Sequence, residues 1–374
     1  MNSDPFRRRI AMALGGLSLF LVVDVSLGKV GRVAEDWAAE RAGRDAVTIE
    51  RGYRVQHPYY HHDLIAAYDG VGAFGPIRYT VRTNSLALRD GSTREIPTRT
   101  DAFRILLMGD SFTEGLGVDY DSTFAGLLAD RYASAGIDVV NGGVVSYSPA
   151  IYWKKIEYLL ERLALQVDAV VLFLDLADIL DEAFSYRIDS MGRVVDAPEI
   201  PRGAIDAWTW NSLTYRSVGK ARRMLLSLPP LPRCGINDVP DPECLWMSPA
   251  MDLYGREGFR RADEHMTRLA ELLRARRIPL TIVVYPWADQ LKVNDRSSPH
   301  VTYWRQWAKR ERADFIELFT PFFAEADSLG TEEAITRYFI QDDVHWSASG
   351  HRLVAESFAP QFATTFSTSR DESP

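Results

Sequence analysis

Cysteine is scarce in this 374-residue chain, which contains only two. So few cysteines exclude a fold held together by several disulfides and a structural metal site built from thiolates. Both residues, Cys234 and Cys244, lie in PRCGINDVPDPECLW, a stretch rich in Pro, Gly and Asp. In an oxidising compartment the simplest expectation is a local disulfide between Cys234 and Cys244 that closes this loop.

Clustered positive charge is also missing. The formal net charge is -8 and the isoelectric point is near 5.5. Beyond the first turn the basic residues are scattered, whereas a nucleic-acid binder gathers them on one face. We therefore expect no nucleic-acid partner. With 46% hydrophobic and 25% charged residues, the composition is that of an ordinary globular protein with a sizeable core.

Long hydrophobic runs are absent except at the N-terminus. Arg7, Arg8 and Arg9 precede the apolar run IAMALGGLSLFLVV, and residues 10–28 are about long enough to span a bilayer. A basic flank before an apolar run is typical of a signal anchor or a cleaved signal peptide. We expect residues 1–28 to be an anchor in a bacterial inner membrane, with the rest on the periplasmic or extracytoplasmic side. A cleaved signal, which would make the protein secreted, is the alternative.

The middle of the chain shows a regular alternation. Short apolar runs (FRILLMG, IDVVNGG, AVVLFLDL, PLTIVVYP and DFIEL) alternate with helical patterns at 122–135, 150–165 and 258–277. Continuous apolar strands separated by helices are typical of a parallel sheet covered on both faces. The fold class we expect is therefore a doubly wound α/β domain.

The segments outside this alternation complete the predicted organisation. Residues 29–100 are expected to form a stalk helix, ending near Gly43, and an extension of irregular strands packed on the main domain. The main domain is expected over 101–374. A long insertion at about 183–255 interrupts the alternation of strands and helices, and it contains tryptophans, prolines and both cysteines.

In an open α/β sheet the ligand crevice lies outside the carboxyl ends of the strands, so residues that follow the apolar runs are candidates for chemistry. Ser111 follows the first run in GDSFTEG, where a helix should begin and backbone N–H groups are close. A serine needs a base, and His345 in QDDVHWSASGH is the best candidate. Asp342, three residues earlier, is expected to hold the far side of the imidazole.

Taken together, GDSFTEG and DDVHWSASGH resemble the first and last blocks of the SGNH (GDSL-type) hydrolases. The resemblance covers roughly residues 103–365 and implies a flavodoxin-like sheet and acyl transfer by Ser111, His345 and Asp342. HHDL, RTNSLALRD, VVYPWADQL and HWSASGH resemble, more narrowly, membrane-anchored bacterial members akin to those acting on O-acyl groups of exported polysaccharides.

The middle blocks depart from that family pattern. The resemblance implies an oxyanion hole made by Ser111 and a glycine of the second block, and NGGVVSYSP places Ser146 at that position, with Gly143 just before. In the third block DLAD replaces Gly-x-Asn-Asp, so Ala177 stands where an asparagine donor is expected. Losing such a donor typically lowers the rate about 10²–10³-fold, unless another group substitutes.

Further residues near the expected crevice are candidates for substrate binding, although packing or helix capping would also explain them: His62, Asp178, Trp287 and Trp346. His57, His61 and His62 lack the matching acids or cysteines of a metal site. We expect no metal and no cofactor.

These observations predict a serine esterase or O-acyltransferase whose substrate is an acylated glycan or another ester. Its partners would be a membrane acyltransferase or polysaccharide export machinery. A lysophospholipase or thioesterase is an alternative, favoured by the membrane tether. A polysaccharide-binding assembly subunit, catalytically weakened at Ala177, is another.

Overall fold

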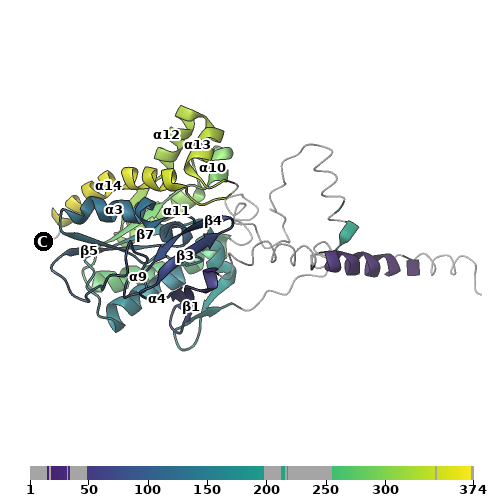
Figure 1. Ribbon diagram of the computed structural model, residues 1–374, viewed down its shortest axis with the longest axis horizontal. Coiled ribbons are helices and arrows are strands. Elements are labelled where there is room, and N and C mark those ends of the chain that lie inside the picture. Colours follow the sequence, from purple (N-terminus) through teal and green to yellow (C-terminus); the bar gives the residue numbers. More distant parts are fainter. Residues whose placement is uncertain are drawn as a thin grey trace, which may run out of the picture. The chain divides into compact units, whose positions relative to one another are not determined.

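A computed structural model describes residues 15–16, 18–31, 33, 49–197, 212–214, 217, 255–341 and 343–371, with side chains up to residue 363. The chain divides into two compact units. One comprises Met1–Asp45 and Glu199–Asp241, and the other comprises Ala46–Pro198 and Pro242–Pro374. Within the first unit, residues 18–31 are helical (Figure 1, purple), and the backbone N–H of Thr214 donates to Asp24 Oδ1 over 2.7 Å.

Among these described residues, no helix is both long and apolar enough to cross a membrane. The predicted anchor includes residues 1–14 and 17, which lie outside the described part, so it stays a prediction. Most of the predicted stalk helix lies outside the described residues. Cys234 and Cys244 lie outside them too, as does most of the insertion.

The second unit is built around a five-stranded parallel sheet with strand order β11-β10-β7-β5-β6. Read from the other edge, this is the 2-1-3-4-5 order of flavodoxin-like folds. Each apolar run of the sequence forms one strand, which confirms the predicted fold class. The strands are β5 (Phe103–Met108), β6 (Ile137–Asn141), β7 (Ala169–Leu174), β10 (Leu280–Val284) and β11 (Asp314–Glu317).

Helices cover both faces of this sheet. Figure 1 shows α3 (Phe124–Ala133) and α14 (Ala348–Asp371) along one side, where they contact each other, and α4 (Pro149–Glu157) and α9 (Arg256–Ala275) in contact along the other. The buried residues of α9 recur at helical spacing, so one stripe of this helix faces the core. They are Phe259, Ala262, Met266, Leu269, Ala270 and Leu273.

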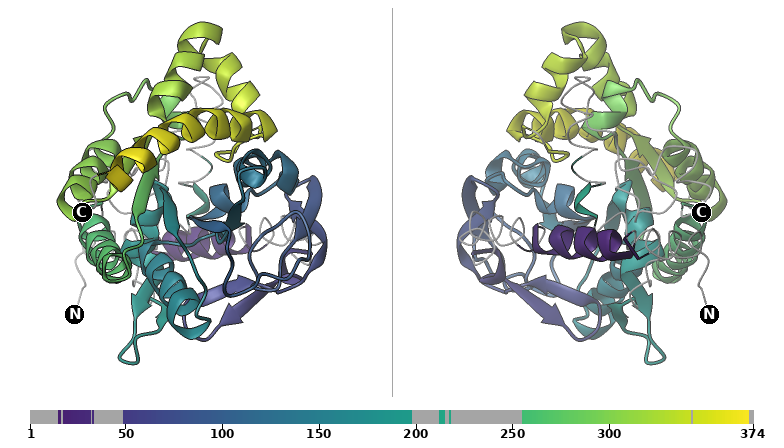
Figure 2. Two further views of the ribbon diagram at one scale, coloured as in Figure 1. Left: turned by 90° about the vertical axis from the view of Figure 1, so that its left-hand side faces the viewer. Right: turned by 90° about the vertical axis from the view of Figure 1, so that its right-hand side faces the viewer.

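The remaining helices are mostly short. Figure 2 shows α12 and α13, in light green, beside the yellow α14. Contacts link α12 to α13 and α13 to α14. Their bounds are α2 (Ser111–Glu114), η1 (Tyr120–Ser122), η2 (Tyr158–Arg162), α5 (Ala177–Leu180), η3 (Asp181–Ser185), α10 (Ala288–Lys292), α11 (Pro299–Glu311), α12 (Phe319–Leu329) and α13 (Thr331–Tyr338).

Antiparallel hairpins flank the sheet. Two of them form the extension that precedes β5, and the third opens the insertion after β7. The first and third hairpins touch, because β2 contacts β9 and the backbone N–H of Val194 donates to the carbonyl of Tyr59. The strands are β1 (Arg54–His57), β2 (His61–Leu64), β3 (Asp69–Phe74), β4 (Ile77–Arg82), β8 (Tyr186–Ile188) and β9 (Val194–Asp196).

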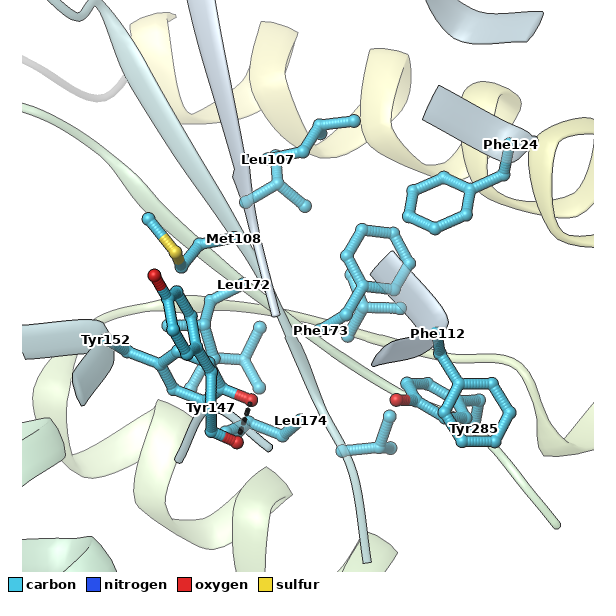
Figure 3. Close-up of a cluster of buried hydrophobic side chains, with 14 of the residues drawn as sticks. Leu107, Met108, Phe112, Phe124, Tyr147, Tyr152, Leu172, Phe173, Leu174 and Tyr285 are labelled. Carbon is cyan, nitrogen blue, oxygen red and sulfur yellow. Dashed lines mark hydrogen bonds between the residues drawn. The ribbon is translucent and has the colours of Figure 1, made fainter. Parts of the chain in front are cut away.

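The core lies on both sides of the central strands, and every residue of β7 is buried. In Figure 3, Phe112 and Phe124 lie on the side of Phe173, whereas Tyr147 and Tyr152 lie on the side of Leu172. A strand buried on both faces needs no polar alternation, which explains the uninterrupted apolar run AVVLFL.

Candidate active site

Ser111 stands where β5 gives way to a short helix. Gly109 follows the last residue of the strand, and a Cβ on it would lie 2.1 Å from Thr113 Oγ1, so only glycine fits there. Asp110 is the N-cap of α2, and its Oδ1 accepts the backbone N–H of Phe112 over 3.0 Å. Ser111 is therefore the first helical residue, 8% exposed, at the carboxyl edge of the sheet.

His345 reaches Ser111 from the segment between α13 and α14. Its Nε2 lies 2.7 Å from Ser111 Oγ, and its Nδ1 lies 2.6 Å from Asp343 Oδ1. A carboxylate only accepts hydrogen bonds, so Nδ1 carries the proton and Nε2 is left to accept from the serine hydroxyl. The structure thus brings the predicted serine and histidine together in the arrangement in which an imidazole can remove a hydroxyl proton.

The carboxylate on the imidazole is not the one that the sequence predicted. Asp342 lies outside the described residues, and Asp343 holds Nδ1. The reason is a local turn in which Asp343 Oδ1 also accepts the backbone N–H of His345 over 2.9 Å, so a spacing of two residues suffices. The predicted acid is therefore corrected from Asp342 to Asp343.

The electrostatics of Asp343 suit this contact. Partial burial raises the pKa of its carboxyl group, but the hydrogen bonds and charge of His345 outweigh burial and bring the pKa below its ordinary value. The imidazole is also held by aromatic contacts, with ring centroids at 5.1 Å to Phe74 and 4.8 Å to Phe112. The ring orientation is thus fixed from several directions.

The loop after β6, residues 142–148, holds two of the three residues predicted for the oxyanion hole, Gly143 and Ser146. The N–H of Gly143 donates to Asn141 Oδ1 over 3.0 Å, so it is already used and the prediction for Gly143 is wrong. Ser146 has φ of 57°, in the left-handed region that favours glycine. This backbone matches the glycine that the resemblance places there, although a serine occupies it.

Ala177 begins α5 and has no side-chain donor, and the aspartates around it are buried. Asp175 Oδ1 accepts the indole N–H of Trp287, and Asp178 Oδ1 accepts the Tyr152 hydroxyl over 2.9 Å. Burial raises the pKa of Asp110, Asp175 and Asp178, and the charges of the other aspartates add to this for Asp110 and Asp178. The side-chain hydrogen bond between Asp110 and Asp175 raises the pKa of Asp110 and lowers that of Asp175, which burial nevertheless raises overall.

Most of the residues predicted to bind substrate are buried in the core. Asp178 is 1% exposed, Trp287 is 3% exposed and Trp346 is 0% exposed, so these predictions are wrong. The ring of Trp346 packs against Phe112 and Tyr285 in the core, which is the commoner place for a tryptophan. His62 is half-buried, and its Nε2 bonds the carbonyl of Val145 at 2.8 Å rather than standing free for a substrate.

Sequence reasoning missed an ion pair beside Ser111. An acid in the first turn of a helix is ordinary, yet the side chain of Glu114 is fully buried and is held by both terminal nitrogens of Arg54, at 2.8 and 2.9 Å. Burial raises the pKa of Glu114, but Arg54 outweighs burial and lowers it overall. The sequence gives no local signal for this pair, because Arg54 and Glu114 are 60 residues apart.

Among the described residues, no group of three or more His, Cys, Asp or Glu is placed to hold a metal ion.

A scan against protein-family models finds no match, and no protein of curated function is significantly similar. Among solved structures, the chain is similar to the psychrotrophic esterase EstA from a Pseudoalteromonas species at 11% identity, covering 71% of this chain and 98% of that chain, with a TM-score of 0.39. It is also similar to Axe2, an acetylxylan esterase from Geobacillus stearothermophilus, at 14% identity, covering 69% and 93% with a TM-score of 0.39. Scores this low support no argument about activity, so the function rests on the site's geometry.

Proposed function

We propose that this protein is a serine ester hydrolase or acyltransferase of the SGNH type. The observation that supports this most directly is the hydrogen-bonded series from Ser111 Oγ through His345 to Asp343, with contacts of 2.7 and 2.6 Å. A hydroxyl on an imidazole that a carboxylate orients is the arrangement by which serine becomes a nucleophile. Its place at the carboxyl edge of the sheet, where α/β folds bind ligands, agrees with this role.

In the proposed reaction, Ser111 Oγ attacks the ester carbonyl while its proton passes to His345 Nε2. Asp343 stabilises the imidazolium, and the proton then goes to the departing alcohol as the tetrahedral intermediate collapses to an acyl-enzyme. Water or a sugar hydroxyl, deprotonated by His345, attacks the acyl-enzyme, and His345 returns this proton to Ser111 Oγ as the bond between Ser111 and the acyl group breaks. The backbone N–H groups of Ser111 and Ser146 are the proposed oxyanion donors. In the part of the chain that the structure describes, neither N–H has a hydrogen-bond acceptor.

We propose ester-linked acyl groups of an exported glycan as the substrate class, with O-acetyl groups first. Support comes from the N-terminal sequence, which predicts a tethered protein outside the cytoplasm, and from the motifs that resemble polysaccharide-modifying members. A membrane acyltransferase or export machinery is the proposed partner. Comparing rates on acetyl and long-chain esters tests the substrate class, because a lipid esterase or thioesterase would prefer the long chain.

The decisive test of the function is Ser111→Ala. We expect hydrolysis of p-nitrophenyl acetate to fall to the uncatalysed rate, because no other hydroxyl is bonded to His345. A fluorophosphonate should label the native protein at Ser111 and leave the variant unlabelled. Ser92→Ala, which changes an exposed serine in a distant turn, serves as the matched control and should keep full activity.

Unchanged turnover in Ser111→Ala would refute the proposed function. A native protein that binds glycans but neither hydrolyses esters nor reacts with the fluorophosphonate would favour an assembly subunit. The observation that favours this second candidate function is that Ala177 has no side-chain donor.

A further inference from the structure

The peptide group between Val145 and Ser146 is held from outside its own loop. It contributes the carbonyl of Val145 and the N–H of Ser146, which are parts of one planar unit. The first hairpin supplies the contact, because His62 Nε2 lies 2.8 Å from the Val145 carbonyl oxygen. A carbonyl only accepts, so His62 Nε2 carries a proton and donates it.

The protonation of the His62 ring allows Nε2 to donate a hydrogen bond in one fixed direction. Burial lowers the pKa of His62 to about 4, so the ring is neutral near pH 7. With the proton on Nε2, the Nδ1 of His62 can only accept, and His61 Nδ1 lies 2.8 Å away. His61 Nε2 lies 3.0 Å from Asp196 Oδ1, which also only accepts, so His61 donates to both partners when it carries both ring protons. The ring tautomer is thereby set by its two partners, and the donor points at the Val145 carbonyl.

The neighbouring peptide groups are held by other elements. The N–H of Val145 donates to Glu114 Oε2 over 2.7 Å, and Glu114 is in turn held by Arg54 of β1. The carbonyl of Ser146 accepts the hydroxyl of Tyr186, from β8, over 2.9 Å. Side chains from β2, α2 and β8 thus fix three consecutive peptide groups around Ser146.

Geometry connects these contacts to the reaction. A trans peptide is planar, so its N–H points away from its C=O. Holding the Val145 carbonyl on His62 therefore aims the Ser146 N–H in the opposite direction and opposes a flip of this peptide. The Val145–Ser146 peptide needs such a contact to prevent the flip, because Ser146 adopts φ of 57°. This conformation costs a non-glycine residue about 1 kcal/mol or more.

We propose that His62 is a positioning residue that aims the Ser146 N–H at the oxyanion, with Glu114 and Tyr186 holding the peptides on either side. This inference rests on the proposed function. It assigns the β1–β2 hairpin, which lies outside the main α/β alternation, a part in the reaction. It also explains how the site works with Ala177 in place of a side-chain donor, since a rigidly held backbone donor needs no reorganisation when charge develops.

The test compares two substitutions of His62. His62→Leu removes the donor, and we expect kcat for p-nitrophenyl acetate to fall roughly 10-fold or more with little change in KM, since the oxyanion contact forms only in the transition state. His62→Gln retains an N–H donor and should recover most of the rate. The inhibition constant of a trifluoromethyl ketone, which forms the oxyanion as an adduct on Ser111, should rise in parallel with the loss in kcat/KM.

His57→Leu is the matched control. His57 lies on the same hairpin, but its Nδ1 accepts the N–H groups of Tyr59 and Tyr60, and its ring packs on Tyr60 and Tyr158. Among the described residues it makes no hydrogen bond to residues 142–148. We expect this variant to keep the native kcat. Tyr186→Phe should lower kcat by a smaller factor than His62→Leu, because it frees a neighbouring peptide rather than the one that carries the donor.

The outcomes separate the inference from the function. If the native enzyme hydrolyses the ester, Ser111→Ala abolishes this, and His62→Leu keeps full kcat, the inference is overturned and the function stands. An equal loss in His57→Leu and His62→Leu would assign the effect to the hairpin's folding and would also overturn it. If the native protein shows neither turnover nor labelling at Ser111, both proposals fall together.

Discussion

Two fully buried carboxyl groups flank Ser111, and their environments differ. Glu114, on one side, meets both terminal nitrogens of Arg54, and its pKa is lowered despite burial. Asp110, on the other side, meets Asp175, and its pKa is raised well above the ordinary value by burial and by the charge of Asp175. Burial is common to both sites, so the partner decides the direction of the shift.

The difference also separates two structural roles. An ionised Glu114 accepts strong hydrogen bonds and can hold the N–H of Val145 beside Ser146. A protonated Asp110 can donate, and so it can share its proton with Asp175 where the ends of β5 and β7 meet. One side of Ser111 is therefore held by an ion pair and the other by a carboxylic acid pair. The predictions below perturb these two arrangements, from the largest expected effect to the smallest.

Arg54→Met should leave Glu114 buried without its paired cation. The carboxyl group of Glu114 would then favour protonation, as that of Asp110 does. Breaking a buried pair in this way typically costs about 3–5 kcal/mol in the free energy of unfolding. Urea unfolding at pH 8 measures the loss. The loss should shrink at pH 5, because without Arg54 the pKa of Glu114 rises and protonation then relieves the buried charge.

Arg94→Met is the control for that change. Arg94 pairs with Asp90 and Asp138 away from Ser111, and its side chain is 41% exposed, so its loss should cost about 1 kcal/mol or less. An equal loss for both arginines would contradict the idea that the Arg54–Glu114 pair is special.

Asp343→Asn tests a carboxylate whose partner is a histidine, whereas Glu114 has an arginine and Asp110 has another aspartate. The variant keeps an oxygen for Nδ1–H but loses the charge that stabilises the imidazolium. We expect kcat/KM for p-nitrophenyl acetate to fall roughly 10²-fold, the low end of what a positioned base contributes. Asp342→Asn should cost far less, and the reverse ranking would restore the acid that the sequence predicted.

Asp110→Asn tests the protonated side of Ser111, and of these variants we expect it to have the smallest effect. Asparagine is an equally good N-cap, and its amide can donate to Asp175 as the protonated acid does. In the native protein Asp110 retains its proton to higher pH than in the unfolded chain, so its contribution to stability declines as pH rises above about 4 towards the raised pKa. Asparagine does not titrate, so this decline is removed.

The variant should therefore gain stability relative to the native protein as pH increases from 5 to 8. Each 1 kcal/mol gained should raise Tm by about 1–2 °C, because the entropy of unfolding grows with chain length, and a thermal melt measures this shift. A difference in Tm that stays the same at pH 5 and pH 8 would show that Asp110 is ionised in the folded protein.

Much of the fold could be predicted from local pattern. The apolar runs formed β5, β6, β7, β10 and β11, and the helical patterns formed α3, α4 and α9 close to the expected bounds. These elements are continuous in sequence, and their periodicity reports burial directly. Ser111 and His345 were found because each lies in a distinctive block of residues.

Long-range partners could not be predicted in the same way. Arg54 and Glu114 are 60 residues apart, and His62 and Val145 are 83 apart, with no local pattern linking either pair. The predictions for Trp287 and Trp346 failed because position after a strand does not say whether an aromatic ring points into the crevice or into the core. The acid was missed by one residue because a turn decides which of two adjacent carboxylates returns to the ring.

The sequence by itself determined the alternation of strands and helices, the strand end that presents Ser111 and the block that carries His345, because these depend on neighbouring residues. Only the tertiary structure decided which acid serves His345, which carboxyl group beside Ser111 is ionised, and how the Ser146 N–H is aimed. Each of those depends on groups from distant segments brought within about 3 Å in a low-dielectric interior, where the partner sets the charge and direction of a buried group.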